Sequence, residues 1–259
     1  MFFDNRELAL AHHMADISGE ILRRYWRTPV SVDQKADFSP VTHADREAEE
    51  AMRSVLAANF PDHGIFGEEH GRTNENATKQ WVIDPIDGTR SFIAGYPIFT
   101  TLIALMQQDK PLFGIIDQPI NNERWQGLAG EQTTCNGKPV LVRDMRELAN
   151  ANLATTSMLH FTPKETEVFK ALRTSCANFQ QGGDAYAYAM LASGNLDIVI
   201  DAHMKPYDYC ALIPVIEGAG GIITDWSGKP LSTQSNGSVL AAGTKELHEA
   251  VLSILNMSS

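Results

Sequence analysis

Two carboxylates, Asp84 and Asp87, follow an apolar predicted strand and flank Pro85 at a turn that continues into Gly88. Both side chains can point at one spot beyond the strand end, and two like charges about 4 Å apart repel by roughly 4 kcal/mol at an effective dielectric constant near 20. Converging acids therefore hold a proton, pair with bases or bind a hard metal, and few bases lie nearby in the sequence. Gly88 lets the backbone approach a ligand, or open a helix whose N-terminus favours an anion. The alternative is a simple strand-to-helix turn in which an Asp caps the helix.

Two further acidic elements occupy similar places. Glu68 and Glu69 directly follow a short apolar strand, and Asp208 opens a predicted helix that runs to Glu217. Taken singly, an exposed Glu pair is usually solvated, and an Asp at a helix start is usually an N-cap. Considered with the first two carboxylates, they indicate a site of oxygen ligands, and no His pair stands at metal spacing. Hard oxygen ligands select Mg²⁺ or Mn²⁺ over zinc.

The N-terminal part of the chain must position these acids with a mixture of helices and strands. Apolar residues at helical spacing predict an amphipathic helix over residues 5–26. Thr42 followed three residues later by Asp45 is a capping pattern, and it predicts a helix over residues 44–58. Predicted strands follow, of which the last three are expected to be antiparallel neighbours: 65–66, 81–83, 98–106, 112–117 and 123–128.

After Arg143 the pattern changes to alternating strands and helices. The predicted strands are 152–156, 176–180, 196–200, 221–224 and 238–242. The predicted helices are 164–174, 184–193, 208–218 and 244–255. Such alternation indicates an α/β arrangement with a largely parallel sheet. We therefore predict an α+β half over residues 1–145, which carries most of the acids, and an α/β half over residues 146–259, which carries Asp208 and the leaving-group pocket.

Composition excludes several classes of protein. The 259 residues are 43% hydrophobic and carry a formal net charge of −11, without a basic patch that could bind nucleic acid. No apolar run approaches the roughly 20 residues that span a bilayer, and charges near the N-terminus argue against a signal peptide. Three cysteines without close spacing argue against a disulfide framework and a zinc site. We expect a cytoplasmic enzyme that acts on a small molecule, with neither nucleic acid nor membrane as a partner.

Several spaced motifs resemble the inositol monophosphatase family. They are WVIDPIDGTRSF over residues 81–92, GEE over 67–69, the KADFSPVTHAD element over 35–45, and Tyr207-Asp208 followed by Gly220-Gly221. The resemblance covers nearly the whole chain. It implies a layered αβαβα sandwich, a lithium-sensitive, Mg²⁺-dependent phosphomonoesterase activity, and a homodimer.

Carried over position by position, the resemblance implies these metal ligands: Glu68, Asp84, the carbonyl of Ile86, Asp87 and Asp208. It makes Glu68, Thr89 and Asp45 the catalytic set, in which Thr89 positions the attacking water and Asp45 accepts the hydroxyl proton of Thr89. The resemblance also places Lys35 near the phosphate, although an exposed surface lysine is an equal alternative. The backbone amides of Gly88 and Thr89 would bind the phosphate at a helix start.

The leaving group is suggested by departures from the inositol-specific pattern. Arg90-Ser91 stands where those enzymes usually have Thr-Asn, and Tyr207 stands where they have Trp. The segment from Gly183 through Asp197, with KPYD over residues 205–208, is similar to the histidinol-phosphate phosphatase branch, which belongs to histidine biosynthesis. Its substrate carries an ammonium and an imidazole, which favour carboxylates in the pocket wall. The candidate substrate-binding residues are Asp184, Asp201, Arg90 and Tyr186.

Each of these candidates has a structural alternative. Asp184 is also a reasonable N-cap and Asp201 a strand-end residue, Arg90 could pair with an acid, and Tyr186 could simply pack in the core. Other functions also remain open: an inositol-1-phosphate, nucleotide-bisphosphate or broad-specificity phosphatase, or a family member with a protein-binding regulatory role. A sugar-bisphosphate phosphatase is a weaker alternative, because this chain lacks the basic residues expected to bind a second phosphate.

Overall fold

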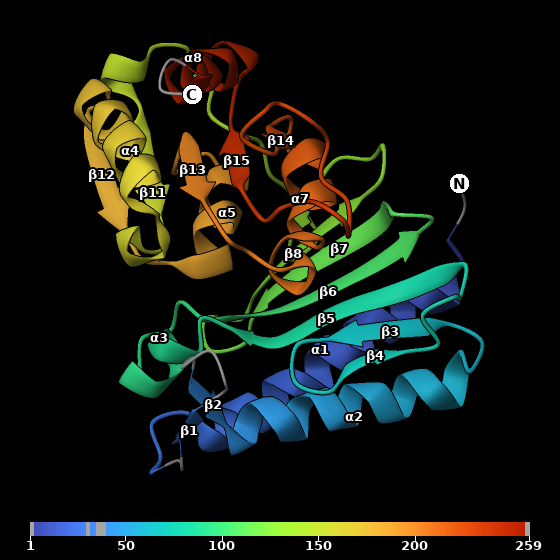
Figure 1. Cartoon of the computed structure of the whole chain (residues 1–259). Helices are drawn as coiled ribbons and strands as arrows, with labels where there is room; N and C mark the ends of the chain where they lie inside the picture. The colour runs from blue at the N-terminus through green and yellow to red at the C-terminus, as the bar shows by residue number, and fades with distance from the viewer. Residues whose placement is uncertain (1–2, 30–31, 35–39, 257–259) are drawn as a thin grey trace.

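The computed structural model describes residues 3–29, 32–34 and 40–256, and in them helices and sheets alternate in the order αβαβα (Figure 1). The helix pair below the first sheet is α1 (Asn5–Tyr25) and α2 (His43–Asn59). The helices between the sheets are α5 (Asp184–Ala192) and α7 (Leu212–Gly218), and the second sheet is covered by α4 (Pro163–Ser175) and α8 (Lys245–Asn256). The layered sandwich predicted from the sequence is confirmed.

The two lower helices begin at capping boxes and bury one face. In α1 the side chain of Asp4 caps the first turn, and that of Glu7 accepts the backbone N–H of Asp4 at 2.6 Å. In α2 the predicted pair forms, because Asp45 Oδ2 accepts the backbone N–H of Thr42 at 2.7 Å. Met14 and Met52 are fully buried against the first sheet, and burying such a side chain contributes about 1.5–3 kcal/mol.

The first sheet has eight strands in the order β10-β9-β8-β7-β6-β5-β3-β4 within the described residues. Its inner strand β5 pairs parallel with β3 and antiparallel with β6, and the predicted antiparallel run of β6, β7 and β8 is confirmed. The strands missed by the sequence prediction are short. The bounds are β3 Gly64–Gly67, β4 Gly71–Thr73, β5 Lys79–Asp87, β6 Thr100–Gln107, β7 Lys110–Gln118, β8 Glu123–Leu128, β9 Thr134–Cys135 and β10 Lys138–Pro139, with β1 Val32–Gln34 and β2 Pro40–Thr42 paired separately.

The second sheet has the order β12-β11-β13-β15-β14. It is largely parallel, as predicted, but mixed, because β15 alone among its described strands runs against the others. Strands β12, β11 and β13 are parallel, whereas β15 runs antiparallel to both β13 and β14. A parallel neighbour needs a long crossover, usually a helix, but β14 and β15 are joined by residues 225–238 without one. The bounds are β11 Asn152–Thr155, β12 Asn178–Gln181, β13 Ile198–Asp201, β14 Ile222–Thr224 and β15 Val239–Ala242.

The helix predicted over residues 208–218 is two helices, α6 (Pro206–Tyr209) and α7. Pro214 has no N–H to donate to the carbonyl of Cys210, and its ring crowds that carbonyl. The helix therefore breaks at Cys210 and Ala211. The break lets α7 lie flat on the first sheet: a Cβ at Gly114 of β7 would stand 2.1 Å from the carbonyl oxygen of Ala211.

The remaining short elements connect the layers. They are α3 (Thr89–Ala94) and two turns of 3₁₀ helix, Leu148–Asn150 and Met158–His160. A core that includes Trp125, Tyr188 and Leu212 fills the space between the sheets, so the two halves pack through the middle helices. Among the described helices, none combines the length and the apolar character needed to cross a membrane.

Candidate active site

A β-bulge at the end of β5 aims the first carboxylates. The pairing of β5 with β6 is regular up to Asp84 and shifts register before Asp87, and Pro85 lies in the irregular stretch. Proline is tolerated at such a place because a bulge residue need not donate to the ladder. The backbone N–H of Ile86 donates to Asp84 Oδ1 at 2.9 Å, and Thr101 Oγ1 donates to the carbonyl of Pro85 at 2.8 Å. These bonds fix the turn that presents Asp84, Ile86 and Asp87.

The tertiary structure brings Asp208 to the same place. One carboxylate oxygen each from Asp84, Asp87 and Asp208 lies within 4.8 Å of the others. Asp208 is held by its own helix start, because its Oδ2 accepts the backbone N–H of Lys205 at 2.7 Å. Glu68, directly after β3, lines the same cavity of about 170 Å³, together with Ile86, Gly88 and Thr89.

The acid cluster raises the pKa of its own members. Burial and then the charges of Glu68, Asp87 and Asp208 raise the pKa of Asp84 well above its usual value. Burial followed by the charges of Asp184 and Asp208 does the same to the pKa of Asp87. Burial and the nearby Glu68 raise the pKa of Asp208 to about 8, although the Lys205 N–H opposes them. Carboxylates that repel one another in this way have the donor chemistry of a hard divalent cation site.

Thr89 and Asp45 meet as the sequence predicted. Thr89 Oγ1 lies 3.3 Å from Asp45 Oδ1 and 3.2 Å from the carbonyl oxygen of Ile86, so the hydroxyl has two acceptors for its proton. Asp45 is fully buried, and its other oxygen accepts the N–H and the hydroxyl of Thr42 at 2.7 and 2.6 Å. The capping box of α2 therefore fixes the carboxylate that faces Thr89.

Gly88 permits a close approach by Asp184. Its φ of +87° lies in the left-handed region, and a Cβ there would stand 2.6 Å from Asp184 Oδ2. Asp184 itself has a φ of +45° and accepts a hydrogen bond from Ser91 Oγ at 3.2 Å. Burial raises the pKa of Asp184, while Ser91 and the nearby Arg90 lower it. The carboxylate of Asp184 thus lies at the cavity wall, beside the turn that presents Asp84 and Asp87.

Asp201 also lines the cavity, but its oxygens are already bonded. Oδ1 accepts from Thr155 Oγ1 at 3.0 Å and from the Thr156 N–H at 2.7 Å. Oδ2 accepts from Thr156 Oγ1 at 3.2 Å and from the Tyr188 hydroxyl at 3.0 Å. Burial raises the pKa of Asp201 to about 6 in spite of these bonds. The hydrogen bonds therefore give Asp201 a structural role, in which it holds Thr155, Thr156 and Tyr188 in place beside the cavity.

The structure does not bring Tyr186 to this cavity. Its hydroxyl donates to Glu123 Oε2 at 2.7 Å and its ring packs edge-on against Trp125. Residues two apart on a helix point to different sides, whereas residues four apart share a side. Helical spacing from Asp184 therefore selects Tyr188, whose hydroxyl reaches Asp201. That signal was present in the sequence.

The other predicted residues have varied outcomes. Lys35 lies outside the described residues. Arg90 is exposed on α3 and does not line the cavity, but its charge acts on Asp184 and His160. Sequence reasoning missed His160 and His203, which line the cavity from the α4 side and from the loop after β13. No motif marks either histidine, and only the packing of separate loops brings them together.

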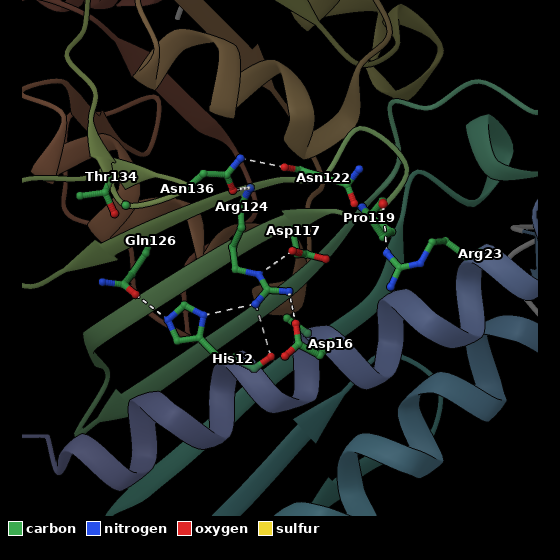
Figure 2. A pocket seen from close by; sticks show the side chains of 12 residues that line it. His12, Asp16, Arg23, Asp117, Pro119, Asn122, Arg124, Gln126, Thr134 and Asn136 are labelled. Carbon is green, nitrogen blue, oxygen red and sulfur yellow. Dashed lines mark hydrogen bonds and ion pairs between the residues drawn. The ribbon is translucent and has the colours of Figure 1, made fainter.

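Figure 2 shows a larger cavity, of about 650 Å³, between α1 and the strands β7 and β8. Its two carboxylates are paired with one arginine. Arg124 donates to Asp117 Oδ1 at 2.6 Å and to Asp16 Oδ1 at 2.8 Å, and it contacts the ring of His12. Among these described residues, no group of carboxylates converges as it would at a cation site. We therefore assign the reaction to the smaller, acidic cavity.

Comparisons with known proteins agree with this geometry. A model described as the inositol monophosphatase family matches residues 4–259. The chain is 46% identical over 260 residues to the bifunctional phosphatase IMPL2, chloroplastic, of Arabidopsis thaliana, covering 97% of this chain and 75% of that protein. It is 35% identical over 237 residues to the histidinol-phosphatase of Chlorobaculum parvum, covering 91% and 92%. The structure of an inositol monophosphatase from Zymomonas mobilis superposes with a TM-score of 0.90 at 44% identity, covering 97% and 98%.

Proposed function

Because the chain belongs to the inositol monophosphatase family, we propose that it is a Mg²⁺-dependent phosphomonoesterase that hydrolyses L-histidinol phosphate to L-histidinol and phosphate. The observation that carries the proposal is the convergence of Asp84, Asp87 and Asp208 beside an additional carboxylate, Asp184, in one cavity. The first three suit a metal that would in turn bind the phosphate, and the fourth suits a cationic leaving group.

The residues present fit a hard divalent cation. The candidate ligands, which are the side chains of Glu68, Asp84, Asp87 and Asp208 and the carbonyl of Ile86, offer oxygen atoms only. Burial and the charges of the neighbouring acids raise the pKa of Asp84, Asp87 and Asp208, which supports a bound cation at this place. When bound, Mg²⁺ supplies charge to neutralise the phosphate dianion and lowers the pKa of the attacking water.

The chain's own residues bind and orient the reactants. In hydrolysis the water oxygen forms a bond to phosphorus, the bond from phosphorus to the ester oxygen breaks, and the leaving oxygen takes up a proton. Thr89 Oγ1 donates to Asp45, which turns a lone pair of the hydroxyl toward the water and so orients it. The first N–H groups of α3, at Thr89 and its neighbour Gly88, are available for the phosphate oxygens, since a helix start leaves its N–H groups without intrahelical acceptors.

We assign the leaving group to the part of the cavity wall that is formed by Asp184. Asp184 presents a carboxylate to the cavity, and an ammonium on the carbon next to the ester carbon would be within reach of such an acid. A charge-assisted contact of this kind contributes about 1.5–3 kcal/mol. The relative from Chlorobaculum parvum, named a histidinol-phosphatase, supports the same substrate.

A panel of esters tests the proposal. We expect the specificity constant kcat/KM for L-histidinol phosphate to exceed that for inositol 1-phosphate, and we expect excess EDTA to abolish hydrolysis of both. Full activity in EDTA would contradict the metal requirement. A higher constant for inositol 1-phosphate would favour the second candidate function, which is supported by the similarity to the Zymomonas mobilis inositol monophosphatase.

A further inference from the structure

Three basic side chains from separate segments lie at or near the mouth of the acidic cavity. His160, at the end of the second 3₁₀ turn, and His203, in the loop after β13, line the cavity and are exposed at its mouth. Arg90 of α3 does not line the cavity, but its charge acts on His160. Their proximity shows in the pKa of His160, which partial burial lowers first and the charges of Arg90 and His203 lower further. In the part of the chain that the structure describes, neither Arg90 nor the His160 ring has a hydrogen-bond partner. These groups are not engaged in holding the fold together.

The protein fixes the orientation of His203. Its Nε2 lies 3.1 Å from Glu165 Oε2, which also accepts the backbone N–H of Thr162 at 2.7 Å. Burial raises the pKa of Glu165, but hydrogen bonds from Thr162 and His203 bring it below its ordinary value. A carboxylate only accepts hydrogen bonds, so Nε2–H of His203 is the donor in this contact and Nδ1 is the ring nitrogen left for a ligand. The residue has a φ of +62°, a left-handed conformation that His adopts more often than most residues.

The cavity thus has an acidic wall at Asp184 and a basic, aromatic mouth. L-Histidinol phosphate has two different groups beyond its phosphate, an ammonium and an imidazole. The ammonium belongs at Asp184, because a carboxylate pairs with a cation. A neutral imidazole suits the mouth, because its N–H can donate to the acceptor on His203 and its ring can stack on His160.

We propose that His160 and His203 form the subsite that recognises the imidazole of the leaving group, with Glu165 as the residue that positions His203. This inference rests on the proposed histidinol-phosphatase function and names the side chains that select its substrate. It concerns discrimination between phosphate esters, since neither histidine lies among the acids or at Thr89.

The experiment compares esters that differ by one group at a time. L-Histidinol phosphate has both groups, phosphoethanolamine has the ammonium alone, and p-nitrophenyl phosphate has neither. The variants are His160→Phe, which retains a ring without nitrogens, and His203→Asn, since Asn tolerates a positive φ. His13→Phe, at an exposed position on α1, is the matched control.

We expect each variant to lower the ratio of kcat/KM for L-histidinol phosphate to that for phosphoethanolamine by about tenfold, at about 1.4 kcal/mol per decade, mainly through KM. The His13→Phe ratio should equal that of the wild type. Equal losses on both esters, or an unchanged ratio, would overturn the proposal. If the wild type hydrolyses fructose 1,6-bisphosphate better than phosphoethanolamine and the variants lose that preference, the mouth binds an anion and the proposal also fails.

Failure of the broader function gives a different result. In that case the wild type itself prefers inositol 1-phosphate to L-histidinol phosphate, before any variant is made. If the wild type prefers L-histidinol phosphate and the variants keep that preference, only the assignment of the imidazole subsite is wrong.

Discussion

The backbone N–H of Ala185 donates to Asp87 Oδ2 at 2.6 Å, so the first turn of α5 is bonded directly to the last residue of β5. This bond joins the segment that presents Asp184 to the segment that presents the acid cluster. In the proposed site, the other oxygen of Asp87 would bind the cation. The relative position of the two carboxylates is therefore set by a short backbone contact and not by flexible side chains.

Asp87→Asn separates this structural bond from the charge. The Asn carbonyl oxygen can still accept from Ala185, while one ligand charge is lost from the cluster. We expect turnover to fall at least about a hundredfold, because a ligand charge acts in the transition state as well as on binding. Steady-state kinetics with saturating Mg²⁺ measure the effect, and Asp62→Asn at an exposed loop is the control. A change confined to KM would mean that Asp87 only supports the turn.

Thr89→Ala and Asp45→Asn should each lower turnover, and the double variant should be little worse than the poorer single one. Both groups act on the same water, and effects of groups that act as one unit are not additive. Because Asp45 also belongs to the capping box, unfolding is measured in parallel. Thr42→Ala, which removes the cap hydroxyl at a cost of about 1 kcal/mol, controls for that role. Fully additive losses of turnover would assign Asp45 to the fold alone.

The stability of the metal-free protein should depend on pH in a defined direction. The pKa of Asp208 is raised to about 8 in the folded state from 3.8, so the folded state binds more protons than the unfolded state between these values. Stability therefore falls as pH rises toward 8, and we expect a lower midpoint of thermal unfolding at pH 9 than at pH 6.5 in EDTA. Mg²⁺ should reduce this difference, and Asp208→Asn should reduce it in EDTA. A midpoint that rises with pH in the wild type would contradict the prediction.

Asp201→Asn should lower stability more than it alters specificity. The Asn amide can accept at only one of its two positions, whereas Asp201 receives four hydrogen bonds from Thr155, Thr156 and Tyr188. Leaving buried donors unpaired costs about 1–3 kcal/mol. Urea unfolding in the presence of Mg²⁺ measures this cost, with Asp33→Asn at an exposed position as the control. Unchanged stability with a selective loss of L-histidinol phosphate hydrolysis would instead show that Asp201 contacts the leaving group.

In contrast to Asp201→Asn, Asp184→Asn should alter substrate specificity more than it lowers stability. Asn accepts the positive φ of this position and can still bond Ser91, so little stability should be lost. The preference for L-histidinol phosphate over p-nitrophenyl phosphate should fall by roughly one to two orders of magnitude, as expected for a lost charge-assisted contact. Equal losses on both esters would place Asp184 in the catalytic scaffold.

Much of the fold and the metal-type acids could be predicted from the chain itself. The capping pair Thr42 and Asp45, the strand that ends at Asp84 and the turn through Gly88 are local features, each set by a few neighbouring residues. Hydrophobic periodicity and capping patterns depend on residues within one or two helical turns, so they can be recognised without knowledge of the rest of the molecule. The combination of acids at element ends already grouped Asp208 with the first two, and the family motifs then added the expectation that all of them are metal ligands.

Only the tertiary structure decided the leaving-group side of the cavity. The sequence could not show that Asp201 is already saturated, that Tyr186 points to Glu123, or that His160 and His203 share one mouth, because these contacts join segments far apart in the chain. The reversed direction of β15 in the second sheet could not be predicted from local sequence either, since strand direction depends on how the chain returns across the layer. The sequence determined which groups could do chemistry, whereas long-range packing determined which of them meet.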